Sequence, residues 1–209
     1  QGYSPFTTWT RGAAWIICGY AEQLEFLDTV QGADLDAVGG RRAVTDLFLE
    51  TARAACDYYI DGYSARDGVP YWDSMALNTH RLGDFTKKEA DPFNDFEPVD
   101  SSAAAIAAQG FLRLGTYLTA QGEQAAGRKY FQAGLTIADT LFDEPYLATD
   151  RKHQGLLLHS VYHRPNGWDY VPRGRKVPCG EACMWGDYHA VELALLIRRL
   201  ADGKYYTFF

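Results

Sequence analysis

Apolar side chains recur every three to four residues in five stretches of the chain, the spacing of a helix that buries one face. The first stretch places Ile16, Tyr20, Leu24 and Leu27 on one side. No stretch shows the polar–apolar alternation of a half-buried strand. The pattern therefore predicts an all-α fold, with helices over residues 9–30, 41–59, 103–118, 123–142 and 185–201.

The residues between these stretches mark the ends of the helices and indicate how the helices pack. Asp100 and the two serines after it are candidate N-terminal caps for the third helix, which opens with a run of mostly small residues, Ala103 to Ala108. Small side chains let helices approach closely, so we expect this helix to lie deep in the molecule. Gly122 leaves only a short link to the fourth helix, which predicts an antiparallel neighbour.

The remaining segments are predicted to be loops, and their length favours one of two helical architectures. Residues 67–73 cannot be helical throughout because Pro70 forces an extended residue before it. We interpret residues 78–98 as an exposed connection and residues 165–178 as a polar loop. Residues 155–163 fit either a short strand or a helical turn. Helix pairs with such long aromatic loops favour a helical toroid or solenoid over a four-helix bundle.

Charge and cysteine content narrow the function classes. A net charge of -7 without clustered Lys and Arg argues against a nucleic-acid partner. No stretch approaches the roughly 20 apolar residues of a membrane span. Four cysteines are too few for a disulfide framework. Cys18 and Cys56 fall in apolar helical patterns, which is typical of buried thiols. Cys179 and Cys183 could form half a metal site, but the sequence offers no second ligand pair at a suitable spacing. We therefore predict neither a membrane protein nor a metal protein.

The most distinctive motif places Arg11 between Trp9 and Trp15 at the start of the first helix. Backbone N–H groups lack intrahelical partners there, which favours a bound anion. A planar guanidinium suits carboxylate or phosphate, and indole faces suit the apolar faces of sugars. From these residues alone, a ligand-binding arginine and an arginine that caps a neighbouring helix within a tryptophan-rich core remain equal alternatives.

Five motifs in order resemble glycoside hydrolase family 88, the unsaturated glucuronyl hydrolases, and more distantly family 105, the unsaturated rhamnogalacturonyl hydrolases. They are residues 8–15 (TWTRGAAW), 69–73 (VPYWD), 100–108 (DSSAAAIAA), 157–159 (LLH) with His163, and 185–188 (WGDY). The resemblance implies an (α/α)6 toroid of six α-hairpins. It matches the later part of the family sequence, so residues 1–209 would form the C-terminal half of a single toroid domain, with no separate second domain.

The resemblance also implies an activity. Family members remove an unsaturated uronic acid from the non-reducing end of lyase-generated oligosaccharides by hydrating the ring double bond. That reaction needs a general acid and a general base, and the family's two catalytic aspartates precede the Trp-x-Arg-Gly motif. Only eight residues precede Trp9 here, none acidic, so the pair would lie upstream of Gln1. No cofactor is implied, and the partner would be the oligosaccharide together with the N-terminal half of the toroid.

Several residues match the family's substrate-binding positions. The resemblance implies that Arg11 receives the uronate carboxylate, that Trp9 and Trp15 flank it, and that Trp72 forms a further aromatic wall. We expect Asp73 to be a loop or binding carboxylate, and Asp100 a helix cap. His159, His163 and Trp185 are further cleft-lining candidates; the two histidines, four residues apart, would share a face to chelate a metal only if their segment were helical.

Two other classes remain as alternatives. A non-catalytic carbohydrate-binding or scaffold protein would keep the aromatic half-cleft without the acid and base. An unrelated α-toroid of the terpene-cyclase kind would need an Asp-rich metal motif, which the sequence lacks. The chain opens almost directly on a motif, so its sequence says little about a leader peptide for export. We expect a cytoplasmic or periplasmic protein.

Overall fold

The computed structural model describes residues 2–207, and five α-helices dominate them. They are α1 (Thr10–Leu27), α2 (Gly40–Tyr58), α3 (Ser101–Ala120), α4 (Gln124–Leu141) and α5 (Met184–Ala201). Within the described residues the only β-type pairing consists of isolated bridges. The all-α prediction is confirmed. The largest difference is at the end of α1, where backbone bonds from residues 28–30 to the last turn close the helix at Leu27 rather than at Val30.

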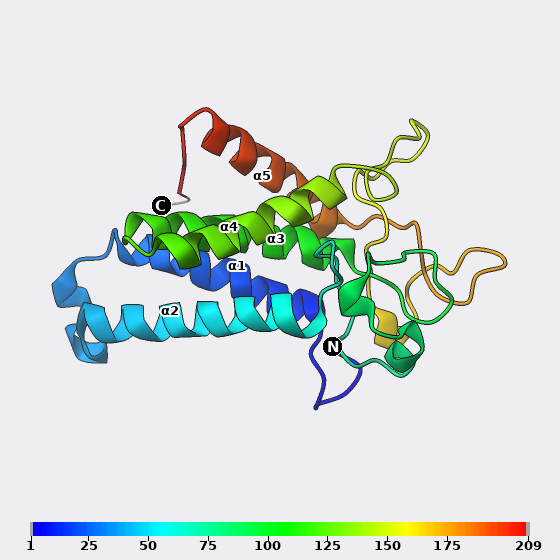
Figure 1. Ribbon diagram of the computed structural model, residues 1–209, viewed down its shortest axis with the longest axis horizontal. Coiled ribbons are helices and arrows are strands. Elements are labelled where there is room, and N and C mark those ends of the chain that lie inside the picture. Colours follow the sequence, from blue (N-terminus) through cyan, green and yellow to red (C-terminus); the bar gives the residue numbers. More distant parts are fainter. Residues whose placement is uncertain (1, 208–209) are drawn as a thin grey trace.

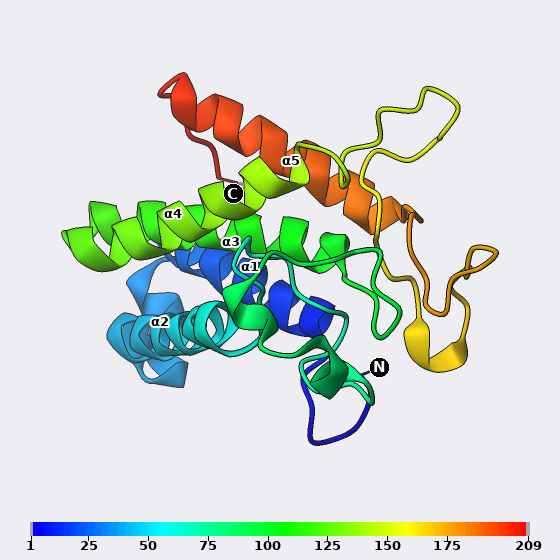
Figure 2. The same cartoon turned by 45° about the vertical axis from the view of Figure 1, so that its right-hand side comes forward.

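The five helices form successive antiparallel pairs. In Figure 1, α1, α3 and α5 run in one direction, and α2 and α4 run back. Helix α2 packs on α1 and α4 packs on α3, while α3 also contacts α1 and α5 (Figure 2). This arrangement of hairpins side by side agrees with the predicted toroid or solenoid. It also brings the N-terminal ends of α1, α3 and α5 to the same side of the molecule, where the long loops gather.

Helix α3 is the centre of the core, as its small residues predicted. Residues 103–108 are fully buried. At Gly110 the backbone of α1 is so close that an added Cβ would lie 2.7 Å from the backbone nitrogen of Cys18. Gly115 makes the corresponding approach to α4, where a Cβ would lie 2.7 Å from the nitrogen of Phe131. The small side chains are therefore what allows α3 to pack between its neighbours. Cys18 and Cys56 are buried, as predicted.

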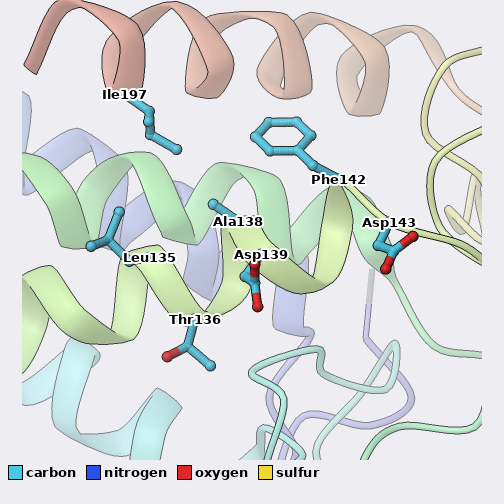
Figure 3. A pocket seen from close by; sticks show the side chains of 7 residues that line it. All are labelled: Leu135, Thr136, Ala138, Asp139, Phe142, Asp143 and Ile197. Atoms are coloured by element: carbon cyan, nitrogen blue, oxygen red, sulfur yellow. The ribbon is translucent and has the colours of Figure 1, made fainter. Parts of the chain in front are cut away.

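A groove separates the second half of α4 from α5 and reaches the end of α4 near the long loops (Figure 3). It measures about 690 Å³, and its lining combines apolar side chains with a threonine and two aspartates. Within residues 2–207, α5 has no helix that runs back along it as α2 does along α1. The lining residues are Leu135, Thr136, Ala138, Asp139, Phe142, Asp143 and Ile197.

The loops between helices are irregular but held by specific bonds. Residues 78–98 contain two short 3-10 turns, Thr79–Leu82 and Phe85–Lys87, and are largely exposed, as predicted. The segment 155–163, which the pattern left open, is neither helix nor strand; only Leu157 forms a bridge, to Leu147. Across residues 2–207, none of the helices combines the length and apolar character needed to cross a membrane.

Candidate functional site

The site lies where the N-terminal ends of three parallel helices meet. Arg11 is in the first turn of α1, Asp100 is the N-cap of α3, and Trp185 is in the first turn of α5. The Asp100 carboxylate accepts hydrogen bonds from the backbone N–H of Ser102 at 3.1 Å and of Ala103 at 3.3 Å. The predicted cap is therefore confirmed, and the same side chain also reaches α1.

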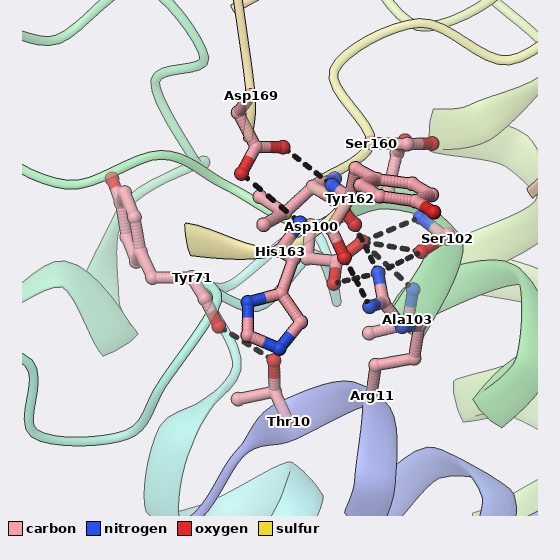
Figure 4. A network of polar contacts seen from close by, with 12 residues as sticks. Thr10, Arg11, Tyr71, Asp100, Ser102, Ala103, Ser160, Tyr162, His163 and Asp169 are labelled. Atoms are coloured by element: carbon pink, nitrogen blue, oxygen red, sulfur yellow. Dashed lines mark hydrogen bonds and ion pairs between the residues drawn. The ribbon is translucent and has the colours of Figure 1, made fainter. Parts of the chain in front are cut away.

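Arg11 joins α1 to α3 and to the loop before α5 (Figure 4). Its Nη1 lies 3.3 Å from Asp100 Oδ2 and also donates to the carbonyl oxygen of Val161, while Nη2 donates to the carbonyl oxygen of Tyr162 at 2.9 Å. Arg11 is 4% exposed and Asp100 is fully buried. Burial raises the pKa of Asp100 above its usual value, although the adjacent guanidinium opposes that shift.

Three indole rings surround the Arg11 guanidinium. Its carbon lies 5.1 Å from the ring centroid of Trp9, 5.9 Å from that of Trp15 and 4.8 Å from that of Trp185. Trp9 and Trp15 meet edge to face, with centroids 5.8 Å apart. A guanidinium at these distances is attracted by the ring faces and is more weakly hydrated than an ammonium. The cation is therefore held in an aromatic setting from which bulk water is largely excluded.

These residues line one pocket of about 290 Å³. It contains five of the eight predicted site residues, and in addition Tyr162 and Trp168, which the sequence analysis missed. An aromatic residue within a polar loop, five positions after the motif histidine His163, is the signal that could have identified Trp168. Within residues 2–207, no carboxylate lines this pocket. The lining residues are Trp9, Arg11, Trp15, Tyr162, His163, Trp168 and Trp185.

The structure does not bring Trp72 and Asp73 to this pocket. Trp72 is 3% exposed, and its Nε1 donates to the buried Glu97 carboxylate at 2.8 Å, so its ring offers no face to a ligand. Asp73 is fully buried and accepts hydrogen bonds from the Tyr3 N–H at 2.8 Å and the Thr7 hydroxyl at 3.0 Å. Both residues brace the chain that enters α1, and we leave them out of the proposed binding set.

The two histidines have different positions. His159 is 3% exposed and adopts a left-handed backbone conformation (φ 64°), so the segment that would pair it with His163 is not helical. Its Nδ1 accepts from the Gly180 N–H at 3.0 Å, and burial lowers its pKa to about 4. His163 lines the pocket, but His159 does not. Within the described chain no group of three or more His, Cys, Asp or Glu side chains is placed to hold a metal ion.

A second groove adjoins the pocket, with Trp15 lining both. It lies between α1, α3 and α5 and measures about 360 Å³. Two glutamates, Glu22 and Glu192, give it an acidic character, and burial raises the pKa of Glu22. His189 contacts Gln109 at 2.7 Å through Nδ1 and has its pKa lowered to about 4 by burial. Within residues 2–207, Arg11 is therefore the only Lys or Arg that lines either cavity.

Two of three similar sequences are unsaturated glucuronyl hydrolases, and the third is an unsaturated chondroitin disaccharide hydrolase. No protein-family model matches the chain. An unsaturated glucuronyl hydrolase from Formosa agariphila is 26% identical over 197 residues, covering 92% of this chain and 37% of that protein. One from Bacillus sp. (strain GL1) is 27% identical over 206 residues, covering 99% and 43%. An unsaturated chondroitin disaccharide hydrolase from Streptococcus pyogenes is 26% identical, covering 93% and 38%.

Solved structures of unsaturated glucuronyl hydrolases resemble this chain in fold. The crystal structure of unsaturated glucuronyl hydrolase from Bacillus sp. GL1 matches with a TM-score of 0.67 and 26% identity, covering 100% of this chain and 44% of that one. A heparin-specific unsaturated glucuronyl hydrolase matches in fold with a TM-score of 0.66 at 24% identity, covering 99% and 43%. The chain thus resembles unsaturated glucuronyl hydrolases in sequence and has the fold of part of their (α/α)6 toroid, spanning about two fifths of their length.

Proposed function

We propose that this chain is the carboxylate-binding part of a glycoside hydrolase that removes an unsaturated uronic acid from the non-reducing end of lyase-generated oligosaccharides. Hydration of the ring double bond would release the next sugar. The relatives support the activity class, and the pocket supports the ligand, since it combines one guanidinium with four indole side chains. Arg11 would take the carboxylate, and Trp9, Trp15 and Trp185 would face the ring.

The hydrogen-bonding of Arg11 is the observation that carries this proposal. A guanidinium has five N–H donors in a fixed plane. Nη1 donates to the Asp100 carboxylate and the Val161 carbonyl oxygen, and Nη2 donates to the Tyr162 carbonyl oxygen. Within residues 2–207, the buried Nε has no hydrogen-bond partner. Nε is therefore the guanidinium donor that lacks an acceptor among the described residues, and a planar carboxylate of the ligand would supply one. Because Asp100 already offsets the charge, hydrogen-bond geometry supplies the recognition.

We propose further that the chain forms the C-terminal half of a single toroid domain, and that the acid and base lie in the other half. The hydration needs two groups that donate and accept protons, and no carboxylate lines the pocket within residues 2–207. The chain's span of 37–43% of its curated relatives supports this division. The same absence of a carboxylate favours a second candidate function, a carbohydrate-binding protein without turnover.

A binding experiment with an unsaturated glucuronyl disaccharide tests the ligand assignment. Arg11→Lys keeps the charge beside Asp100 but removes the planar fork. We expect this variant to bind roughly 30-fold more weakly by isothermal titration calorimetry, since the loss of a hydrogen bond to a charged group costs about 1.5–3 kcal/mol. Arg66→Lys, at an exposed ion pair with Glu89, is the matched control and should bind like the wild type. Equal affinity of Arg11→Lys and the wild type would overturn the assignment.

Turnover separates the two candidate functions. Hydration removes the ring double bond and with it the ultraviolet absorbance of the unsaturated uronide. The hydrolase proposal expects the complete toroid to bleach this absorbance and Arg11→Ala in that protein to slow the reaction sharply. Loss of absorbance with the 209-residue chain alone would rule out the non-catalytic alternative, and a complete toroid that binds the disaccharide without bleaching it would support that alternative.

A further inference from the structure

One face of α1 and α5 has no helix packed against it within residues 2–207. Helix α1 meets α2 through the Tyr20 and Phe48 rings, whose centroids lie 5.2 Å apart. Because a helix turns by about 100° per residue, Trp15 and Glu22 lie on the opposite side of α1 from Tyr20. There they line the groove of about 360 Å³ between α1, α3 and α5, and a Cβ added at Gly19 would meet no atom within 4 Å. We call this open face, which lines the groove, the inner face.

The inner face carries negative charge that the described residues do not balance. Glu22 and Glu192 are half-buried in it, and the charge of Glu192 adds to burial in raising the pKa of Glu22. The buried Arg113 lies 3.9 Å from Glu22 but only 2.8 Å from Glu25. Three carboxylates thus share one guanidinium, and within residues 2–207 Glu192 accepts a hydrogen bond from a neutral group, the Tyr206 hydroxyl at 3.0 Å. Carboxylates withdrawn from water without a cation are costly, so this face favours a positively charged partner.

The rest of the groove shows which kind of cation suits it. His189 supplies no charge near neutral pH, because burial lowers its pKa to about 4. Within the described chain no group of three or more His, Cys, Asp or Glu side chains is placed to hold a metal ion, so the groove suits an organic cation. Trp15 and Tyr188 also line the groove, with 42% and 55% of their surfaces exposed. The faces of such rings attract a guanidinium or an ammonium group.

We propose that the inner face docks the other half of the toroid, which inserts an arginine side chain into the groove, where Glu22 and Glu192 receive its guanidinium. This inference rests on the proposed function, because it takes the chain to be one half of a toroid. The chain spans 37–43% of its curated relatives, so a protein of their length has enough further chain to cover this face. A guanidinium is favoured over an ammonium because it is more weakly hydrated and bonds carboxylates through a planar fork. Charge, and not apolar packing alone, would then fix how the two halves align.

Glu192→Gln tests the contact in two settings, the 209-residue chain and the complete toroid. The amide keeps an acceptor for the Tyr206 hydroxyl but removes the charge. In the 209-residue chain we expect a higher urea midpoint, because the repulsion between Glu192 and Glu22 is relieved. In the complete toroid we expect the folding equilibrium constant to fall about tenfold, because the arginine loses a charged hydrogen-bonding partner. The same substitution should therefore change stability in opposite directions.

Glu50→Gln is the matched control. Glu50 is exposed on α2, and its side chain makes no hydrogen bond or ion pair within residues 2–207. The substitution removes the same charge from a chain of net charge -7 and should act alike in both settings. A gain or no change from Glu192→Gln in the complete toroid would overturn the arginine contact. An equal loss in both settings would overturn it too, because the partner of Glu192 would then lie within the 209 residues.

Hydrogen exchange separates these results from a failure of the proposed function. If the amides of α1 and α5 exchange equally fast in the two proteins, the further chain does not cover the inner face, and the half-toroid proposal fails together with the contact. Slower exchange in the complete toroid, without a loss of stability from Glu192→Gln, would overturn the arginine contact alone. The uronide site would stand in that case, because disaccharide binding at Arg11 is measured independently.

Discussion

The guanidinium of Arg11 lies 3.3 Å from the carboxylate of Asp100, and neither side chain is more than 4% exposed. This ion pair connects the first turn of α1 to the N-cap of α3, and Arg11 extends the connection to the carbonyl oxygens of the loop before α5. The two interpretations of Arg11 that the sequence left as alternatives are thus compatible, because Nη1 and Nη2 make structural contacts while Nε has no hydrogen-bond partner within residues 2–207.

The ion pair predicts a large effect of a nearly isosteric substitution. Asp100→Asn keeps an oxygen that can cap α3 but removes the charge opposite a buried arginine. We expect the free energy of unfolding to fall by about 3–5 kcal/mol, because the guanidinium is left buried without its counter-charge. Urea unfolding followed by circular dichroism measures the change.

The exposed pair of Arg66 and Glu89 is the control for that substitution. Its side chains are 65% and 71% exposed, and its N–O distance is 2.9 Å, shorter than that of the buried pair. Glu89→Gln should change stability by less than about 1 kcal/mol, because water screens such pairs. If Asp100→Asn cost no more than Glu89→Gln, the buried pair would not be the connection we describe.

Two glycine substitutions should change stability in opposite directions. At Gly110 an added Cβ would lie 2.7 Å from backbone atoms of Cys18, so Gly110→Ala must push α3 and α1 apart. We expect a loss of about 1–3 kcal/mol or more. At Gly19, within α1, a Cβ would meet no atom within 4 Å, and Gly19→Ala should add about 0.5–1 kcal/mol by favouring the helix. Thermal unfolding of both variants checks the signs, and a neutral Gly110→Ala would argue against the close helix approach.

The pKa of His159 predicts a pH dependence of stability. Burial lowers this pKa from 6.5 to about 4 in the folded chain. Between those pH values the unfolded chain binds a proton that the folded chain does not, so the free energy of unfolding falls as the pH is lowered, by up to about 1.4 kcal/mol per pH unit. The contribution is complete above pH 6.5 and is lost progressively down to pH 4.

His159→Asn should remove this contribution, since asparagine does not titrate and tolerates the left-handed backbone at this position. His189 and the buried carboxylates titrate in both proteins and cancel in the difference. Measured by urea unfolding from pH 7 to pH 4, the variant should therefore gain on the wild type by about 3 kcal/mol. Parallel stability curves would show that His159 is not buried in its neutral form.

Local sequence determined most of the fold. The helix period, the small residues of α3 and the caps and glycines between stretches are properties of neighbours along the chain, and the five predicted helices match the observed ones closely. The Trp-Arg-Trp motif likewise brings three pocket residues together, because Trp9 is the N-cap of α1 and the other two members lie in its first two turns. Periodicity reports which face of a helix is buried, and that information is local.

Only the tertiary structure decided which side chains meet in the pocket. Arg11 bonds to Val161, 150 positions away, and Trp168 enters from a loop that has no period. Trp72 resembled a binding residue by motif but is covered by its own chain, and the backbone turn at His159 separates two histidines that a helix would have aligned. Loops take their positions from contacts with distant residues, so their side chains are placed only when the helices that carry those contacts have packed.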